Sequence, residues 1–115
     1  MQIVHHVINP EQLRVAAAQA VSVLKVLANQ DRLLLLCQLS QGELCVSELQ
    51  AQLGIGQPTL SQQLAVLRSE GMVSTRRDGK NIHYRIADTS VLEIVAVLHR
   101  LYCPEMPESP QPEPS

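Results

Sequence analysis

Residues 55–71 read Ile-Gly-Gln-Pro-Thr-Leu-Ser-Gln-Gln-Leu-Ala-Val-Leu-Arg-Ser-Glu-Gly, a tight turn followed by a helical pattern. Pro58 suits the first turn of a helix, and the final glycine suits its end. Leu60, Leu64 and Leu67 recur at i, i+4 and i+7, which predicts one buried helix face. The positions between them are mostly short polar side chains, so we expect the opposite face to be exposed.

The residues before this helix predict a shorter one. Ser47-Glu-Leu-Gln50 matches a capping box, which favours a helix start, and Gly54 suits the helix end. Residues 43–46, just ahead of it, are expected to be short and extended. A short helix, a tight turn and a second helix together form the layout of a helix-turn-helix motif.

The residues after the longer helix change to a period of two, which is typical of β-strands. Residues 72–77 alternate, Asp78-Gly79 is a hairpin signal, and residues 81–86 alternate again. His83 and Arg85 fall on one face of the second strand, opposite its apolar residues. The pattern therefore predicts a two-stranded ribbon, or wing, directly behind the helix-turn-helix motif.

Apolar helices flank this central unit. A first helix is expected over residues 10–28, a second over residues 32–39, and a last one from Asp88 or Thr89 to about residue 102. The first and last are apolar on more than one side, which predicts burial against a second copy of the chain. We therefore expect a mainly α fold with a small β-hairpin wing (α+β), a winged helix-turn-helix that forms a homodimer through its first and last helices.

Composition limits the class of protein. The 115 residues are 45% hydrophobic and 17% charged, which predicts one globular domain over residues 10–103, after a flexible N-terminus over 1–9. Residues 104–115 are rich in proline and glutamate and are expected to be a disordered tail. The chain has no Phe or Trp and only two Tyr, so binding that stacks bases on aromatic platforms is nearly excluded. With no membrane-length apolar run, no signal pattern and an odd count of three cysteines, we expect a cytoplasmic protein with reduced thiols.

Charge is distributed unevenly along the chain. The formal net charge is -2, yet residues 55–87 carry five basic and two acidic side chains. A local basic segment matters more than the total charge for contact with a polyanion. In a helix-turn-helix, the second helix enters the major groove, and a two-fold dimer binds an inverted repeat in double-stranded DNA. The predicted DNA contacts are Gln57, Thr59, Ser61, Gln62 and Arg68 from that helix, with Arg76, Arg77, Lys80, His83 and Arg85 on or beside the wing.

Several short segments resemble one family. They are Leu33-Leu-Leu-Leu-Cys37, Gly42-Glu-Leu44, Ile55-Gly-Gln-Pro-Thr-Leu-Ser-Gln-Gln-Leu64, Glu70-Gly71 and Ile82-His-Tyr-Arg85. Over residues 21–103 the chain is similar to the ArsR/SmtB family of bacterial transcriptional repressors, and more narrowly to the persulfide- and redox-responsive branch typified by BigR, SqrR and HlyU. The resemblance implies a repressor, without a cofactor, whose Cys37 and Cys103 react with reactive sulfur species or oxidants to form a disulfide or polysulfide bridge that weakens DNA binding.

The residues themselves leave the thiol chemistry open. From the residues alone, Cys37 in a leucine-rich helix is most simply interpreted as a small buried hydrophobe, whereas Cys103 should be more accessible. A metal or metalloid sensor is the alternative, because the surroundings of Cys45 resemble an arsenic-sensing pattern. That pattern has a second cysteine where this chain has Ser47, so Cys45 would need another thiol, and a structural role for Cys45 is the simpler interpretation.

Other metal and catalytic patterns are weaker. The last helix resembles a zinc-sensing pattern only incompletely, since Asp88-Thr-Ser90 lacks the first histidine and His99 is readable as a surface residue. His5 and His6 form a possible ligand pair near the N-terminus. His83 has no nucleophile or acid partner in the pattern, and no phosphate loop or paired-carboxylate motif is present, so we expect no enzyme. A third alternative is an anti-repressor or interaction protein with weak DNA binding of its own.

Overall fold

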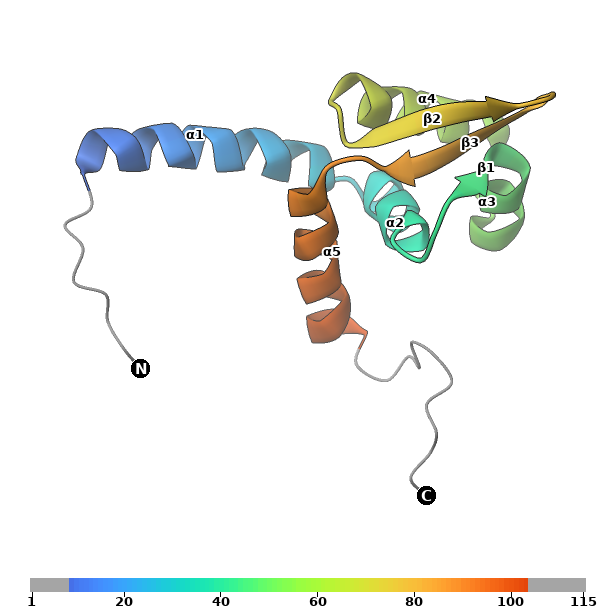
Figure 1. The fold of residues 1–115 in the computed structure, drawn as a ribbon. Helices are drawn as coiled ribbons and strands as arrows, with labels where there is room; N and C mark the ends of the chain where they lie inside the picture. The colour runs from blue at the N-terminus through green and yellow to red at the C-terminus, as the bar shows by residue number, and fades with distance from the viewer. Residues whose placement is uncertain (1–8, 104–115) are drawn as a thin grey trace.

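The computed structural model describes residues 9–103, which form five helices and three strands (Figure 1). In chain order, they are α1 (Pro10–Leu27), α2 (Gln30–Leu39), β1 (Leu44–Cys45), α3 (Val46–Leu53), α4 (Gln57–Ser69), β2 (Val73–Asp78), β3 (Asn81–Ile86) and α5 (Thr89–Tyr102). The fold is the predicted winged helix-turn-helix, mainly α with a small sheet. Apart from Asn9, the predicted flexible N-terminus and the predicted tail lie outside the described residues.

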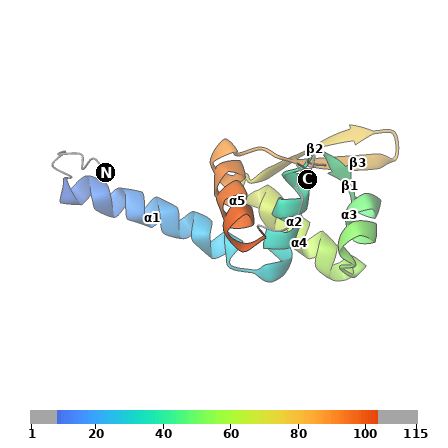
Figure 2. The same cartoon turned by 90° about the horizontal axis from the view of Figure 1, so that it is seen from below.

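Helix α1 begins as the sequence predicts and then leaves the body of the molecule. The Asn9 side chain accepts a hydrogen bond of 2.8 Å from the Glu11 N–H, the usual way of satisfying a free amide at a helix start. Both views show α1 projecting away from the other elements (Figures 1 and 2). Only its last residues, Val26 and Leu27, are buried. Most of this apolar helix is therefore exposed in a single chain.

An aliphatic core joins α2, α3 and α4. The predicted stripe of α4 is confirmed, because Leu60, Leu64 and Leu67 are at most 2% exposed. Arg32 of α2 adds polar contacts to two other helices: it donates hydrogen bonds of 2.9 Å to Gln63 Oε1 on α4 and of 2.7 Å to the Val26 carbonyl on α1. The buried leucines of α2 and α3 are Leu35, Leu36, Leu39 and Leu49.

The sheet has three antiparallel strands in the order β1-β3-β2, so the prediction of a two-stranded ribbon was incomplete. The wing hairpin itself is confirmed, with Asp78 opposite Asn81 and Gly79 at φ +65°, a conformation that favours glycine. The extra strand, β1, comes from the segment predicted only as extended. It pairs with β3, placing Cys45 opposite His83. This pairing depends on residues far apart in the sequence, so the local pattern did not indicate it.

The capping box of α3 lies two residues earlier than predicted. Cys45 is the N-cap, and its N–H donates a hydrogen bond of 2.9 Å to Glu48 Oε1. The prediction of a capping box at Ser47 and Gln50 was therefore wrong. The reason is that β1 holds Cys45 in an extended conformation and α3 can begin directly after it. Gly54 ends α3 in the left-handed region, at φ +71°, as expected.

Helix α5 is capped by Asp88, whose side chain accepts from the Ser90 N–H at 2.8 Å. Val91 and Val95 face the core, but much of the remaining apolar surface is open. The large exposed apolar residues of α5 are Leu92, Val97, Leu101 and Tyr102, and those of α1 are Leu13, Val15, Val21 and Leu24. Within residues 9–103, no helix is long and apolar enough to cross a membrane.

The leucine core makes a stability prediction possible. Leu35→Ala removes a side chain that is 0% exposed and should lower the free energy of unfolding by about 2–5 kcal/mol. Its neighbour Leu34 is 38% exposed, so Leu34→Ala should cost clearly less. Urea titration followed by circular dichroism measures both. Equal losses for the two variants would contradict this description of the core.

Candidate nucleic-acid interface and thiol site

The first two turns of α4 present a polar surface. Because the leucine stripe is buried, Gln57, Thr59, Ser61 and Gln62 are all exposed on the remaining sides of the helix. Ser61 donates a hydrogen bond of 2.8 Å to Gln57 Oε1, one turn earlier. These groups are amides and hydroxyls, which can donate and accept hydrogen bonds at base edges. The four residues predicted at this surface are therefore accessible to a partner.

The start of α4 also offers backbone donors. Gly56 is the N-cap and has no side chain, so no side-chain hydrogen bond caps α4. Free amides at a helix start attract anions such as phosphate. Arg32 of α2 donates a hydrogen bond of 2.9 Å to Gln63 Oε1 and so helps to hold α4 against α2. The sequence interpretation missed this role of Arg32, because its partners lie on other helices.

The wing carries most of the predicted cationic contacts. Arg77, Lys80 and Arg85 are exposed on β2, the hairpin turn and β3, and Arg68 is exposed in the last turn of α4. Arg76 is different, because its guanidinium contacts the Glu43 carboxylate at 2.8 Å. The hydrogen bond from Arg76 lowers the pKa of Glu43, and the same bond raises the pKa of Arg76. The charge of Arg76 is thus balanced within the chain.

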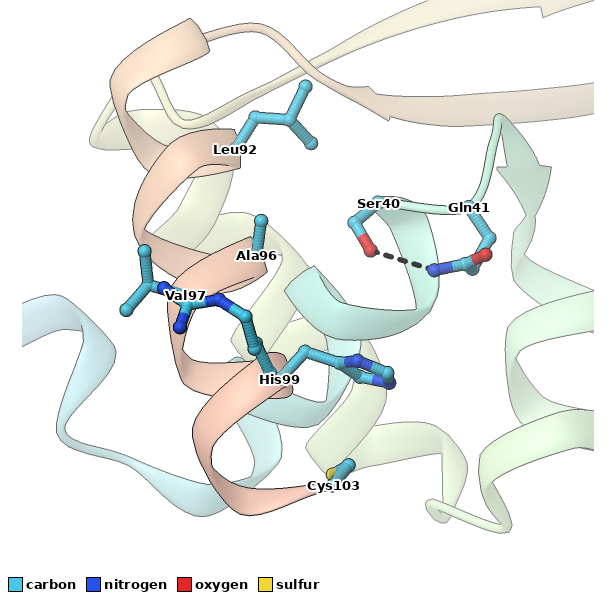
Figure 3. A pocket seen from close by; sticks show the side chains of 8 residues that line it. Ser40, Gln41, Leu92, Ala96, Val97, His99 and Cys103 are labelled. Carbon is cyan, nitrogen blue, oxygen red and sulfur yellow. Dashed lines mark hydrogen bonds between the residues drawn. The ribbon is translucent and has the colours of Figure 1, made fainter. Parts of the chain in front are cut away.

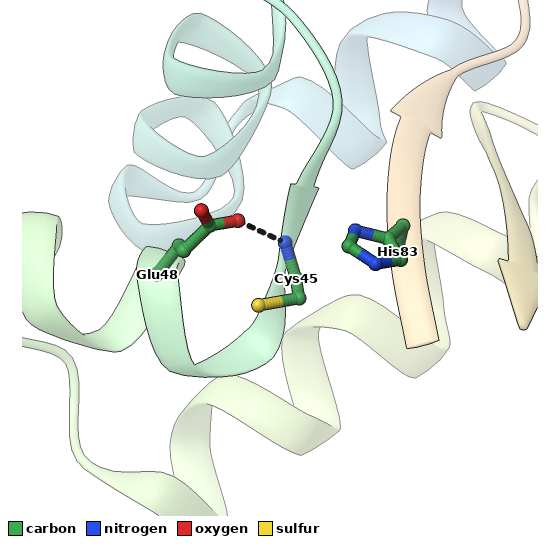
Figure 4. Close-up of side chains that lie close together, drawn as sticks. All are labelled: Cys45, Glu48 and His83. Atoms are coloured by element: carbon green, nitrogen blue, oxygen red, sulfur yellow. Dashed lines mark hydrogen bonds between the residues drawn. The ribbon is translucent and has the colours of Figure 1, made fainter. Parts of the chain in front are cut away.

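His83 lies apart from the exposed wing residues. Its side chain is only 19% exposed, and Nε2 is 4.0 Å from Asp78 Oδ2. The ring faces Cys45 and Glu48 at the start of α3 (Figure 4). The structure therefore places this predicted DNA contact between the wing and α3, with less access to a partner than Arg77 or Arg85.

Two of the three cysteines lie on packed helices. Cys37 is on α2, Cys103 directly follows α5, and α2 packs against α5. Both thiols are free and partly buried. Burial raises the pKa of Cys37, and the negative charge of a Cys103 thiolate raises it further. A charge on Cys103 thus affects the pKa of Cys37, although the two residues are distant in sequence.

A groove lies beside Cys103, with a volume of about 670 Å³ (Figure 3). Helix α5 contributes its apolar and basic side chains, and the end of α2 contributes polar ones. The lining residues are Leu92, Ala96, Val97, His99, Arg100 and Cys103 with Ser40 and Gln41. The groove exposes Cys103 to a small reagent. His99, which the sequence predicts to be a surface histidine, also lines this groove.

Cys45 is buried and has polar neighbours. Its Sγ is 3.3 Å from Ser47 Oγ, and Cys45, Glu48 and His83 each bring one ligand atom to within 4.8 Å of the others. The metalloid alternative required a second thiol beside Cys45, and this cluster contains none. The predicted ligand pair His5 and His6 lies outside the described residues.

Known proteins share this architecture and much of this sequence. The family of arsR-type bacterial regulatory proteins matches residues 29–75. The biofilm growth-associated repressor of Xylella fastidiosa is 45% identical over 93 residues, which are 81% of this chain and 82% of that protein. The transcriptional activator HlyU of Vibrio cholerae is 42% identical over 95 residues, 83% of this chain and 88% of HlyU.

A solved structure gives the same result in three dimensions. The crystal structure of the transcriptional repressor BigR from Xylella fastidiosa aligns with a TM-score of 0.79 and 42% identity, covering 88% of this chain and 100% of that one. The resemblance expected from the sequence is thereby confirmed over most of the chain. This protein therefore belongs to the arsR family of bacterial regulatory proteins, a family of DNA-binding transcriptional regulators and not of enzymes.

Proposed function

We propose that this regulator is a homodimeric repressor that binds an inverted repeat in double-stranded DNA and is released when Cys37 and Cys103 react with reactive sulfur species or oxidants. The observation that supports the proposal is the packing of α2, which carries Cys37, against α5, which Cys103 directly follows, together with the effect of a Cys103 charge on the pKa of Cys37. The thiol chemistry and the DNA surface lie on different elements, so one can control the other only through the arrangement of the helices.

The exposed apolar faces of α1 and α5 support the dimer. Leu24 is 54% exposed and Leu101 is 57% exposed, although both are large aliphatic side chains. Apolar helix faces of this kind are normally covered, and a second copy of the chain supplies matching faces. A two-fold axis between the copies would present two α4 helices to successive major grooves of one DNA face.

The DNA contacts divide into two kinds. Gln57, Thr59, Ser61 and Gln62 of α4 would read base edges in the major groove, where a glutamine can bond an adenine through two hydrogen bonds. Arg68, Arg77, Lys80 and Arg85 would contact phosphates or the neighbouring minor groove, which strengthens binding on any sequence. Arg76 contributes less, because Glu43 already balances its charge.

The thiol reaction would begin at Cys103, which lines the open groove. A persulfide RSSH passes its outer sulfur to the Cys103 thiolate and leaves as the thiol RSH. The Cys37 thiolate then attacks Cys103 Sγ, and the broken S–S bond releases the outer sulfur as hydrogen sulfide, which leaves a Cys37–Cys103 disulfide. An oxidant would instead form a sulfenic acid that Cys37 converts to the same bridge, releasing water. If a second RSSH adds another sulfur to Cys103 before Cys37 attacks, the bridge retains that sulfur and becomes a polysulfide.

The bridge would act through α5. This helix carries Cys103 at its end and also presents an apolar face proposed for the dimer. Fixing its end to α2 would change how the two subunits pack, and with it the spacing of the two α4 helices. A coupling of about 1–3 kcal/mol, typical of such linked sites, corresponds to about a 5–150-fold loss of DNA affinity.

Base reading and phosphate binding can be separated with two variants. The test uses a duplex that the wild-type chain selects from a random pool. The Gln62→Ala variant should lose affinity mainly for that duplex, by about 1–3 kcal/mol. Arg77→Ala should weaken binding to selected and random duplexes alike and reduce the salt slope by about one. Titration at several salt concentrations measures both effects. Equal loss on both duplexes for Gln62→Ala would contradict base reading by α4.

The thiol switch has a direct chemical readout. Treatment with glutathione persulfide should yield an intramolecular bridge between Cys37 and Cys103, which intact mass detects. It should also lower the affinity of the protein for the selected duplex by about 5–150-fold. Cys37→Ser should prevent the bridge and keep the treated protein on DNA, whereas the matched control Cys45→Ser should still respond. Since burial raises the pKa of Cys37, bridge closure should accelerate with rising pH. A bridged protein that binds DNA unchanged would overturn the switch.

The dimer can be tested with matched charges on α1. Leu24→Glu places a carboxylate in the proposed interface and should weaken dimerisation by about 100-fold or more, since an unpaired buried charge costs about 3–5 kcal/mol. Ser22→Glu adds the same charge on the other side of α1, near Lys25, and should remain dimeric. Analytical ultracentrifugation distinguishes the two. A monomeric wild-type chain, or equal dimerisation of the two variants, would contradict the proposed interface.

A further inference from the structure

One ion pair joins the wing to the segment that precedes β1. Glu43 lies just before β1, Arg76 lies in β2, and β3 runs between these two strands in the sheet (Figure 1). Arg76 therefore reaches across β3 to make the contact. Its Nε lies 2.9 Å from Glu43 Oε1 and 3.0 Å from Oε2, and its Nη2 lies 2.8 Å from Oε1. One guanidinium thus engages both oxygens of the carboxylate.

The ion pair lies on the face of the sheet that points away from the core. Side chains alternate between the two faces along a strand. Tyr84 and Ile86 of β3 pack against the core, which places His83 and Arg85 on the opposite face. Arg76 is the cross-strand partner of His83, so it belongs to the same outer face. Three basic side chains therefore share this face with the Glu43 carboxylate.

Glu43 is an ionised group placed among these basic side chains. The hydrogen bond from Arg76 lowers the pKa of Glu43, and the charges of Arg76, His83 and Arg85 lower it further. The other carboxylate on this face belongs to Asp78, whose Oδ2 lies 4.0 Å from His83 Nε2. Glu43 is therefore the carboxylate that neutralises Arg76.

A DNA phosphate would bind Arg76 through the same donors. The guanidinium forms parallel hydrogen bonds with a carboxylate or with a phosphate in the same geometry. The Arg76 side chain is 54% exposed, so a phosphate can approach it from solvent. While Glu43 occupies Nε and Nη2, however, the guanidinium carries no net attraction for a phosphate. Arg77 and Arg85 are exposed, and neither has a comparable carboxylate contact within residues 9–103.

We propose that Glu43 masks Arg76 from DNA and so lowers the affinity of this regulator for duplexes of every sequence. The inference rests on the proposed phosphate contacts of the wing, because Arg77 and Arg85 would bring phosphates close to the ion pair. Phosphate contacts carry no sequence information, so masking one of them weakens binding to random DNA without removing base contacts of α4. The base contacts then supply a larger share of the total affinity. The masking does not depend on Cys37 or Cys103.

The variant Glu43→Gln tests the mask in the full reduced chain. Glutamine keeps a side-chain oxygen that can accept from Arg76, so the fold should be retained, but it removes the charge. Titration should show tighter binding to the selected duplex and to a random duplex by the same factor. One additional phosphate contact steepens the salt slope by about 0.9, so the gain in affinity should be about three- to fourfold larger at 50 mM than at 200 mM salt.

Two further variants separate the mask from a general effect of charge. Glu70→Gln removes the same charge from an exposed residue at the end of α4, and it should leave the salt slope unchanged. The double variant Arg76→Ala/Glu43→Gln should lose the steeper slope, because the unmasked guanidinium is absent. An equal gain in affinity for Glu70→Gln, or a steeper slope that persists in the double variant, would overturn the proposal.

The variant Arg77→Ala distinguishes failure of this inference from failure of the proposed DNA contacts. If Arg77→Ala reduces the salt slope while Glu43→Gln binds no more tightly than the wild type, the wing contacts DNA and only the mask is wrong. If Arg77→Ala leaves the slope unchanged, the proposed wing contact is wrong, and the mask is wrong with it. Weaker binding by Glu43→Gln would show that Glu43 positions Arg76 for DNA, the opposite of masking it.

Discussion

The burial of one leucine stripe determines which side chains of α4 face the solvent. With no Phe or Trp, the core has to be aliphatic, and Leu60, Leu64 and Leu67 fill it almost completely from the α4 side. A helix can present only one face to the core, so burying this stripe turns the polar residues of α4 outward. Arg32 then restrains rotation or sliding of α4 by holding Gln63 from α2. The exposed polar surface of α4, which we propose reads DNA, is thus a consequence of core packing.

Helix α5 connects three properties that are usually considered separately. Val91 and Val95 anchor it in the core, its outer face is apolar and exposed, and Cys103 directly follows its last turn. Chemistry at that end would therefore alter the contacts of the whole helix. The proposed reaction begins at Cys103 because this cysteine lines the groove, whereas burial raises the pKa of Cys37 and lowers the fraction of its reactive thiolate at neutral pH.

At the junction of β1 and α3, a small sheet brings a cysteine, a histidine and a glutamate close together. A strand of only two residues is enough to place a cysteine opposite a histidine, and the capping box adds a carboxylate. The Cys45 N–H donates a hydrogen bond to Glu48 Oε1, and Cys45 Sγ lies 3.3 Å from Ser47 Oγ. The strand pairing of Cys45 with His83 joins the wing to the start of α3.

Local patterns in the sequence determined the helices, their caps at Asn9 and Asp88, the hairpin and the buried face of α4. These features depend on residues within one or two turns of each other, where spacing and side-chain type are sufficient. Tertiary structure alone decided the third strand, the Arg76–Glu43 pair, the cap at Cys45 and the meeting of His83 with Glu48. It also packed α2, which carries Cys37, against α5, which Cys103 directly follows, an arrangement that the sequence could suggest only by resemblance. Contacts between distant segments depend on how the core packs, so the local spacing of residue types does not predict which segments will meet.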